Sequence, residues 1–119
     1  MKLILCLCLL FASSFASASC YWNLLSAQGV GDSSQFQIHI SEVAPNENET
    51  MDVQTAINSA QYLAKKYCGE KLVIRKVECA KPFANLPKIC FVDIEDFGGY
   101  FLISKNYVDH VQVNFNRWD

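Results

Sequence analysis

The chain has 119 residues, with 10 basic and 12 acidic side chains and a formal net charge of −2. A slightly acidic chain without a basic run argues against binding to nucleic acid or to anionic lipid, because both need a positively charged surface. The length suits one domain with a single hydrophobic core.

The N-terminal segment has the pattern of a secretory signal peptide. Lys2 precedes an apolar run, and small residues then lead to an Ala-x-Ala cleavage pattern at Ala16 and Ala18. The apolar run is about half of the ~20 residues that a membrane span requires. We therefore predict a cleaved leader over residues 1–18 and one exported domain, periplasmic or secreted, over residues 19–119, with no transmembrane segment after cleavage.

Four cysteines follow the leader: Cys20, Cys68, Cys79 and Cys90. An even number of cysteines in an exported domain favours disulfides. No Cys-x-x-Cys or His-x-x-His spacing is present, so we predict no zinc or other metal site, and no cofactor motif is visible.

Cys20 also permits a second interpretation. The residues before it, Ser17-Ala18-Ser19, resemble the cleavage site of bacterial lipoproteins, although Ser17 stands where Leu is usual. A lipid anchor on Cys20 is therefore an alternative, and it would leave an odd number of thiols.

The first half of the mature chain predicts one strand and one helix. Residues 21–27 are apolar but too short for periodicity to distinguish a strand from a helical turn, and residues 29–34 are turn-forming. Residues 35–43 alternate as a half-buried strand. An amphipathic helix follows, with Thr50 or Asp52 as its cap and Gly69 as its stop. Its apolar stripe consists of Val53, Ala56, Ile57, Ala60, Leu63, Ala64 and Tyr67.

The second half predicts three or four strands joined by short connections. They cover residues 72–79, 89–95, 100–104 and 108–115, with turns at Gly98-Gly99 and at Lys105-Asn106. Short connections imply antiparallel hairpins.

These elements predict a two-layer α+β sandwich, in which one amphipathic helix packs on a 4–5 stranded antiparallel sheet. The helix should cover the sheet face that carries Phe36, Ile38, Ile40, Val111, Val113 and Phe115. The order of one strand, one helix and then the remaining strands is similar to that of the cystatin-like folds. The Gln-x-Val-x-Gly segment of cystatins is absent, so protease inhibition does not carry over.

The topology also predicts the disulfide pairing. Cys79 ends one strand and Cys90 begins the next, on either side of a hairpin loop. Cys68 ends a helix that returns toward the start of the first strand, where Cys20 lies. We therefore predict the pairs Cys79–Cys90 and Cys20–Cys68.

Few residues have the spacing of a catalytic site. His39 and His110 fall on the polar side of their strands, where a histidine is more often a solvated side chain than a catalytic base. The two could lie at opposite edges of the sheet. Asp109 should not form a dyad with His110, because adjacent strand residues point to opposite faces. Asp93 and Glu95 share a strand face, and Asp96 follows them. Such a pattern more often marks a solvated strand and its turn than a site of acid–base chemistry.

The loop at residues 80–89 is the strongest candidate for a binding site. A disulfide would close its base, and Pro82 and Pro87 would stiffen it. It presents Lys81, Phe83, Leu86 and Lys88. A rigid loop with apolar anchors loses little entropy on docking. The alternative is that its apolar side chains fold back onto the core.

Two further patterns remain open. Tyr21, Trp22 and Trp118 could stack on sugars or pack together as a terminal plug. Asn48-Glu49-Thr50 matches a glycosylation acceptor, which matters only in a eukaryote.

The sequence therefore predicts a small exported binding domain without catalytic activity, an inhibitor or an envelope interaction module that acts through residues 80–89 on another exported or envelope protein. The alternatives are a lipoprotein anchored through Cys20 and a small exported hydrolase that uses the polar sheet face.

Overall fold

The computed structural model describes residues 20–29, 35–44, 51–106 and 109–118. The predicted leader, the turn residues 30–34 and the Asn48-Glu49-Thr50 acceptor lie outside the described residues. Within the described ranges, none of the helices is long and apolar enough to cross a membrane.

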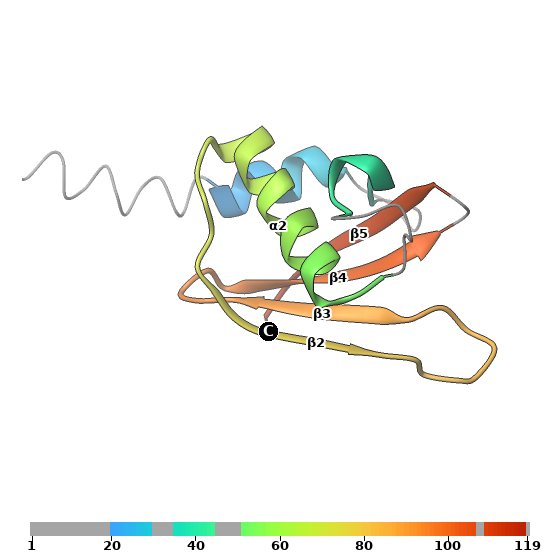
Figure 1. The fold of residues 1–119 in the computed structure, drawn as a ribbon. Helices are drawn as coiled ribbons and strands as arrows, with labels where there is room; N and C mark the ends of the chain where they lie inside the picture. Colours follow the sequence, from blue (N-terminus) through green and yellow to red (C-terminus); the bar gives the residue numbers. More distant parts are fainter. Residues whose placement is uncertain (1–19, 30–34, 45–50, 107–108, 119) are drawn as a thin grey trace, which may run out of the picture.

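Five antiparallel strands form one sheet in the order β1-β5-β4-β3-β2. The elements along the chain are a helical segment at residues 20–28, β1 (Phe36–His39), a 3-10 turn η1 (Ile40–Glu42), α2 (Val53–Cys68), β2 (Ile74–Ala80), β3 (Ile89–Ile94), β4 (Gly99–Asn106) and β5 (His110–Arg117). Both helical segments lie on the same side of the sheet (Figure 1). The predicted two-layer α+β sandwich is confirmed, with residues 20–28 as a second helical element.

Helix α2 begins and ends where its capping residues require. The Asp52 side chain accepts a hydrogen bond from the backbone N–H of Thr55 at 2.8 Å, which satisfies one of the unpaired donors of the first turn. Gly69 ends the helix in the left-handed region, with φ of 68°. Lys65 and Lys66 occupy the last turn, where cations favour the negative end of the helix dipole.

The cap predicts a pH dependence of stability. The hydrogen bond from the Thr55 backbone N–H lowers the pKa of Asp52 below its ordinary value. A carboxylate whose folded pKa is depressed stabilises the fold fully above its unfolded pKa of about 3.9 and loses that contribution as the pH falls through the folded pKa. Asp52→Ala should cost about 1 kcal/mol at pH 7. Urea unfolding at pH 7 and at pH 2.5 should show a smaller difference between wild type and variant at the lower pH; an equal difference would contradict the prediction.

The inward sides of the strands and most of the apolar stripe of α2 form the core; Val53, which the sequence placed in that stripe, is 47% exposed. Buried strand residues include Phe36, Ile38, Cys90, Val92, Phe101, Ile103, Val111, Val113 and Phe115, and buried residues of α2 include Ala56, Ala60, Leu63 and Ala64. The predicted inward face of the sheet is therefore correct. The helical segment 20–28 adds Cys20 and Leu24 to the same core.

Several predicted element ends differ from the structure: β2 begins at Ile74 rather than at residue 72, and β5 ends at Arg117 rather than at residue 115. The first strand does not continue to Val43, because the His39 imidazole accepts a hydrogen bond from the Ser41 backbone N–H and caps η1. Ile40 is buried as expected, but from the turn rather than from a strand. Lys105 and Asn106 do not form a turn; they extend β4, where they pair with Val111 and His110, because the longer ladder satisfies more backbone groups.

The structure contains both predicted disulfides. Cys20–Cys68 joins the helical segment 20–28 to the end of α2, with a Cα–Cα distance of 5.1 Å. Cys79–Cys90 joins residues directly opposite each other on β2 and β3, with a Cα–Cα distance of 4.0 Å. The first pair holds the helical layer together, and the second closes the β2–β3 hairpin.

Candidate functional site

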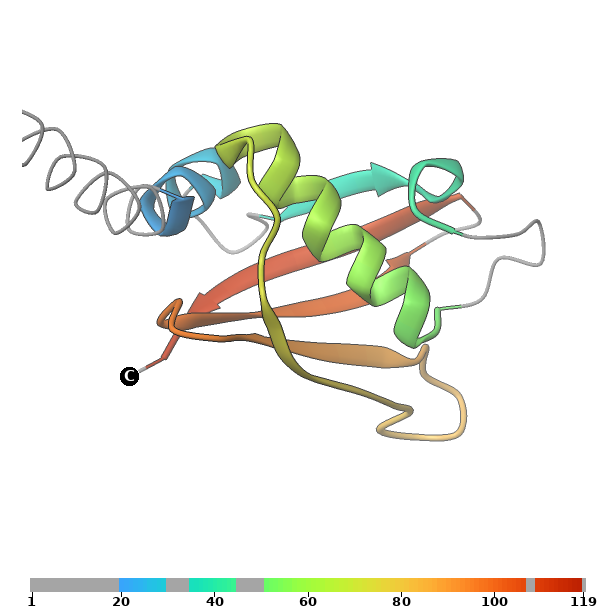
Figure 2. The same ribbon diagram turned by 60° about the vertical axis from the view of Figure 1, so that its left-hand side comes forward.

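The β2–β3 connection, residues 81–88, is here called the tied loop. Its base is closed by the disulfide Cys79–Cys90, and Pro82 and Pro87 stand near its two ends. Within it the Leu86 backbone N–H donates to the Phe83 carbonyl at 3.1 Å, which forms a turn at the tip. The loop projects beyond the end of the sheet that lies next to the start of α2 (Figure 2).

The apolar side chains of the tied loop face solvent. Phe83 is 68% exposed and Leu86 is 41% exposed, so neither folds back onto the core. Lys81 is exposed and Lys88 is half-buried. Residues 79–90 contain these two lysines and no acidic residue, and Lys88 also interacts electrostatically with the Asp52 carboxylate at the start of α2.

The tied loop borders a shallow hollow of about 270 Å³ on the outer face of the sheet. Its lining comes from Glu78, Ala80, Pro82, Ile89 and Phe91. The apolar surface of the loop therefore continues onto β2 and β3.

A second group of side chains, here called the aromatic cluster, lies farther along the outer face and shares Phe91 with this hollow: Phe91, Tyr100 and Trp118. The rings of Tyr100 and Trp118 are 4.5 Å apart between centroids, and Phe91 lies 5.2 Å from Tyr100 and 5.9 Å from Trp118. None of these three residues belongs to the buried core, so the cluster forms on the side of the sheet away from α2.

Asp93 lies beside this cluster, and the structure corrects the expectation that it is solvated. Its side chain is 7% exposed. The Arg75 guanidinium donates to Asp93 Oδ2 from Nε at 2.8 Å and from Nη2 at 2.5 Å, while the Trp118 indole N–H donates to Oδ1 at 3.3 Å. The carboxylate is thus covered by groups from β2 and from the residue after β5. The strand register shifts between Ile74 and Lys76, so Arg75 lies at the irregularity. Local sequence does not predict this shift, and it therefore does not predict the contact of Arg75 with Asp93.

The histidines form a third group, and two expectations about them are wrong. His39 and His110 lie directly opposite each other on neighbouring strands, with ring centroids 5.4 Å apart, rather than at opposite edges. Asp109 Oδ1 does contact His110 Nδ1, at 2.8 Å, because Asp109 belongs to the turn before β5 and does not follow strand alternation. The hydrogen bond from His110 lowers the pKa of Asp109.

Ser41 is the fourth member of this group, and the His39 nitrogen that its hydroxyl contacts also caps η1. Ser41 Oγ lies 2.7 Å from His39 Nδ1, and the same nitrogen accepts from the Ser41 backbone N–H at 3.2 Å. Asp109 Oδ2 lies 3.7 Å from His39 Nε2, and the three charged or titratable side chains are about half exposed. Asp93 does not join them. His110 and Asn116 are six positions apart along β5, about 20 Å, and Asn116 pairs with Tyr100, which pairs with Asp93.

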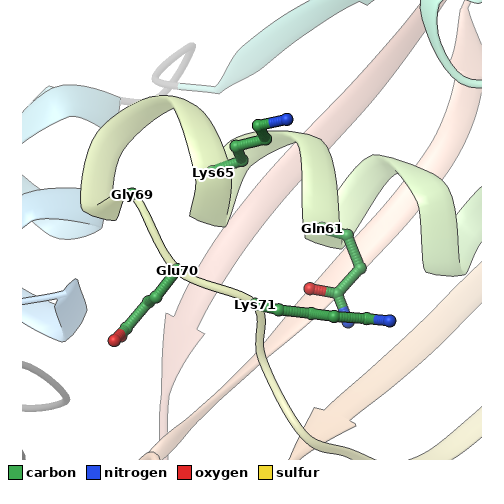
Figure 3. Close-up of a pocket in the computed structure, with 5 residues that line it drawn as sticks. All are labelled: Gln61, Lys65, Gly69, Glu70 and Lys71. Atoms are coloured by element: carbon green, nitrogen blue, oxygen red, sulfur yellow. The ribbon is translucent and has the colours of Figure 1, made fainter.

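The end of α2 borders an open hollow of about 370 Å³, lined by Gln61, Lys65, Gly69, Glu70 and Lys71 (Figure 3). Gln61 bonds both backbone groups of Leu72, with its side-chain nitrogen 2.7 Å from the carbonyl oxygen and its side-chain oxygen 2.8 Å from the backbone nitrogen. This side chain therefore holds the connection from α2 to β2.

The terminal aromatic residues do not form one plug. Tyr21 packs against Phe97 and Phe115 on the α2 side of the sheet, with ring centroids 6.1 and 5.5 Å apart. Trp118 lies on the other face, in the aromatic cluster. Trp22 contacts Tyr21 and is exposed.

Comparisons with protein families, with curated proteins and with solved structures find no match to this chain. In the part of the chain that the structure describes, no group of three or more His, Cys, Asp or Glu side chains is arranged to hold a metal ion.

Proposed function

We propose that this chain is an exported domain that binds another protein through the tied loop. The observation that carries the proposal is the exposure of Phe83 at the tip of a loop closed by a disulfide. A large apolar side chain in water gains free energy when a partner buries it, about 1.5–3 kcal/mol for a residue of this size.

Rigidity supports the same function. The disulfide and the two prolines restrict the loop before any partner binds, so less conformational entropy is lost on docking. The two disulfides are compatible with an oxidising, exported environment.

Charge indicates the kind of partner. Lys81 and Lys88 flank the apolar tip, and no carboxylate is present between Cys79 and Cys90. A complementary partner would present an apolar cleft with an acidic rim, since opposite charges at the rim steer association. An exported enzyme inhibited by the loop, or an envelope protein held by it, would fit this description.

The double substitution Phe83→Ala/Leu86→Ala tests the proposal. Because both side chains are exposed, the free energy of unfolding should change by about 0.5 kcal/mol or less. Capture of the partner from the exported fraction of the source cells should fall by about tenfold or more, since such anchors commonly contribute 2 kcal/mol or more each.

Val73→Ala provides the matched control, because Val73 is 63% exposed and lies outside the loop. This variant should capture the partner as wild type does. Equal capture by the loop variant and by wild type would reject the tied loop as the binding site. A large loss of stability in the loop variant would instead assign Phe83 and Leu86 a packing role.

A further inference from the structure

The outward positions of β5 carry a row of neutral amides. Gln112, Asn114 and Asn116 alternate with the buried Val111, Val113 and Phe115 and therefore lie on the face away from α2. Gln37 of β1 pairs with Gln112 and extends the row sideways. We call Gln37, Gln112, Asn114 and Asn116 the amide row.

This composition is unusual for its place in the sheet. Strand β5 lies between β1 and β4, and asparagine is depleted in strands because its short amide competes with the ladder. Asn116 Nδ2 donates to the Asn114 carbonyl at 3.3 Å, which is a long and local hydrogen bond that joins no second strand. Positions that oppose local preference are candidates for functional sites.

The amide row leads directly to the aromatic cluster. Asn116 pairs with Tyr100 across β4 and β5, and the Trp118 ring lies 4.5 Å from the Tyr100 ring. Trp118 is 46% exposed, yet it is held in place, because its backbone N–H donates to the Gly98 carbonyl at 3.0 Å and its indole N–H donates to Asp93. The result is a fixed aromatic surface, exposed at Trp118 and half-buried at Phe91 and Tyr100, beside neutral hydrogen-bonding groups.

We propose that the amide row and the aromatic cluster together bind a neutral oligosaccharide. A sugar ring presents C–H groups that stack on an aromatic face and hydroxyls that both donate and accept hydrogen bonds, and a side-chain amide also does both. The outward positions of β5 carry no lysine, arginine or carboxylate, and the charge of Arg75 is balanced by Asp93. From Gln112 to Trp118 the surface is about 20 Å long, which suits a chain of several sugar units.

The test uses tetrasaccharides of glucose and of N-acetylglucosamine as probes. In a Trp22→Phe background Trp118 is the remaining tryptophan, so its emission reports on the site. We expect a saturable change in this emission with at least one probe, together with shifts of the side-chain amide signals of Asn114 and Asn116 in NMR spectra.

Two substitutions locate the site. Trp118→Ala should weaken binding, measured by calorimetry, by about tenfold or more, since the stacked area is lost. Asn116→Ala removes one neutral hydrogen-bonding group and should weaken binding by about fivefold. Because Trp118→Ala also removes a contact to Asp93, Asn116→Ala tests the proposal without that contact.

The controls separate this site from the tied loop. Trp22→Ala removes an exposed tryptophan that contacts Tyr21. Gln54→Ala removes an exposed amide of α2 that donates to Asn58. Both variants should bind the oligosaccharide as wild type does. The loop variant Phe83→Ala/Leu86→Ala should also keep oligosaccharide binding. Absence of a saturable signal with both probes would overturn the proposal, as would binding that survives Trp118→Ala and Asn116→Ala. Loss of protein capture in Trp118→Ala, without any oligosaccharide signal, would assign this face to a protein partner instead.

Discussion

Replacing Cys20 and Cys68 by serine should lower the free energy of unfolding by about 4 kcal/mol, because the bridge closes a long loop in the unfolded chain. The two cysteines are 48 residues apart in sequence. Cys20 is completely buried, so the variant also places a serine hydroxyl in the core. For a domain of this size the loss corresponds to a decrease in Tm of about 20 °C. Thermal unfolding followed by circular dichroism measures it.

Cys79→Ser/Cys90→Ser is the matched comparison. Its loop is much shorter, with a separation of 11 residues, and the expected loss is about 3 kcal/mol. A variant without Cys20–Cys68 that unfolds at the wild-type temperature would contradict the structural role assigned to this bridge.

Intact mass before and after reduction tests the lipid alternative in the same samples. The Cys20 sulfur is bonded to Cys68, and a sulfur in a disulfide cannot also carry a lipid thioether. We expect a mass without acyl groups that increases by two hydrogens per bridge on reduction. An acylated Cys20 would contradict both the pairing and the role of this bridge.

Arg75→Leu should destabilise the domain by about 2 kcal/mol, because it leaves the Asp93 carboxylate nearly buried without its principal partner. The loss of stability should be smaller than for a fully buried ion pair, because the Arg75 side chain is largely exposed and water can replace part of its contact with Asp93. Urea unfolding at pH 7 measures the change, and Trp118 emission should shift as well, since its indole N–H donates to the same carboxylate.

The double variant Arg75→Leu/Asp93→Leu separates this explanation from a general effect of substitution. With both partners apolar no unpaired carboxylate remains, so the double variant should recover more than half of the stability lost by Arg75→Leu. Lys76→Leu is the matched control: Lys76 is the neighbouring cation, exposed and paired with Glu78 at 3.2 Å, and its replacement should change stability by about 0.5 kcal/mol or less. Additive losses in the double variant would show that Arg75 and Asp93 are not coupled.

The two proposed surfaces are held in place by different kinds of interaction. The tied loop is held by a covalent bridge at its base. The aromatic cluster is held by noncovalent contacts that converge on Asp93. Substitution of Arg75 should therefore disturb the oligosaccharide surface and leave the tied loop unaffected.

Local sequence was sufficient for the elements that are stabilised by their own residues. Helix α2 was predictable because its apolar period, its Asp52 cap and the Gly69 stop all lie within one continuous segment. The inward faces of the strands followed from alternation, and the disulfide pairs followed from element order. The position of the tied loop followed from the pairing of Cys79 and Cys90.

Contacts between distant residues decided the rest. Residues 20–28 are helical because Cys20 and Leu24 are buried in the core, whereas a short apolar run by itself fits a strand equally well. Asp93 is buried because Arg75 comes from β2 and Trp118 from the end of β5. The sequence by itself determined the helix, the strand faces and the loop; the tertiary structure decided which side chains meet on the outer face, since those contacts depend on strand register and on turns that no local period encodes.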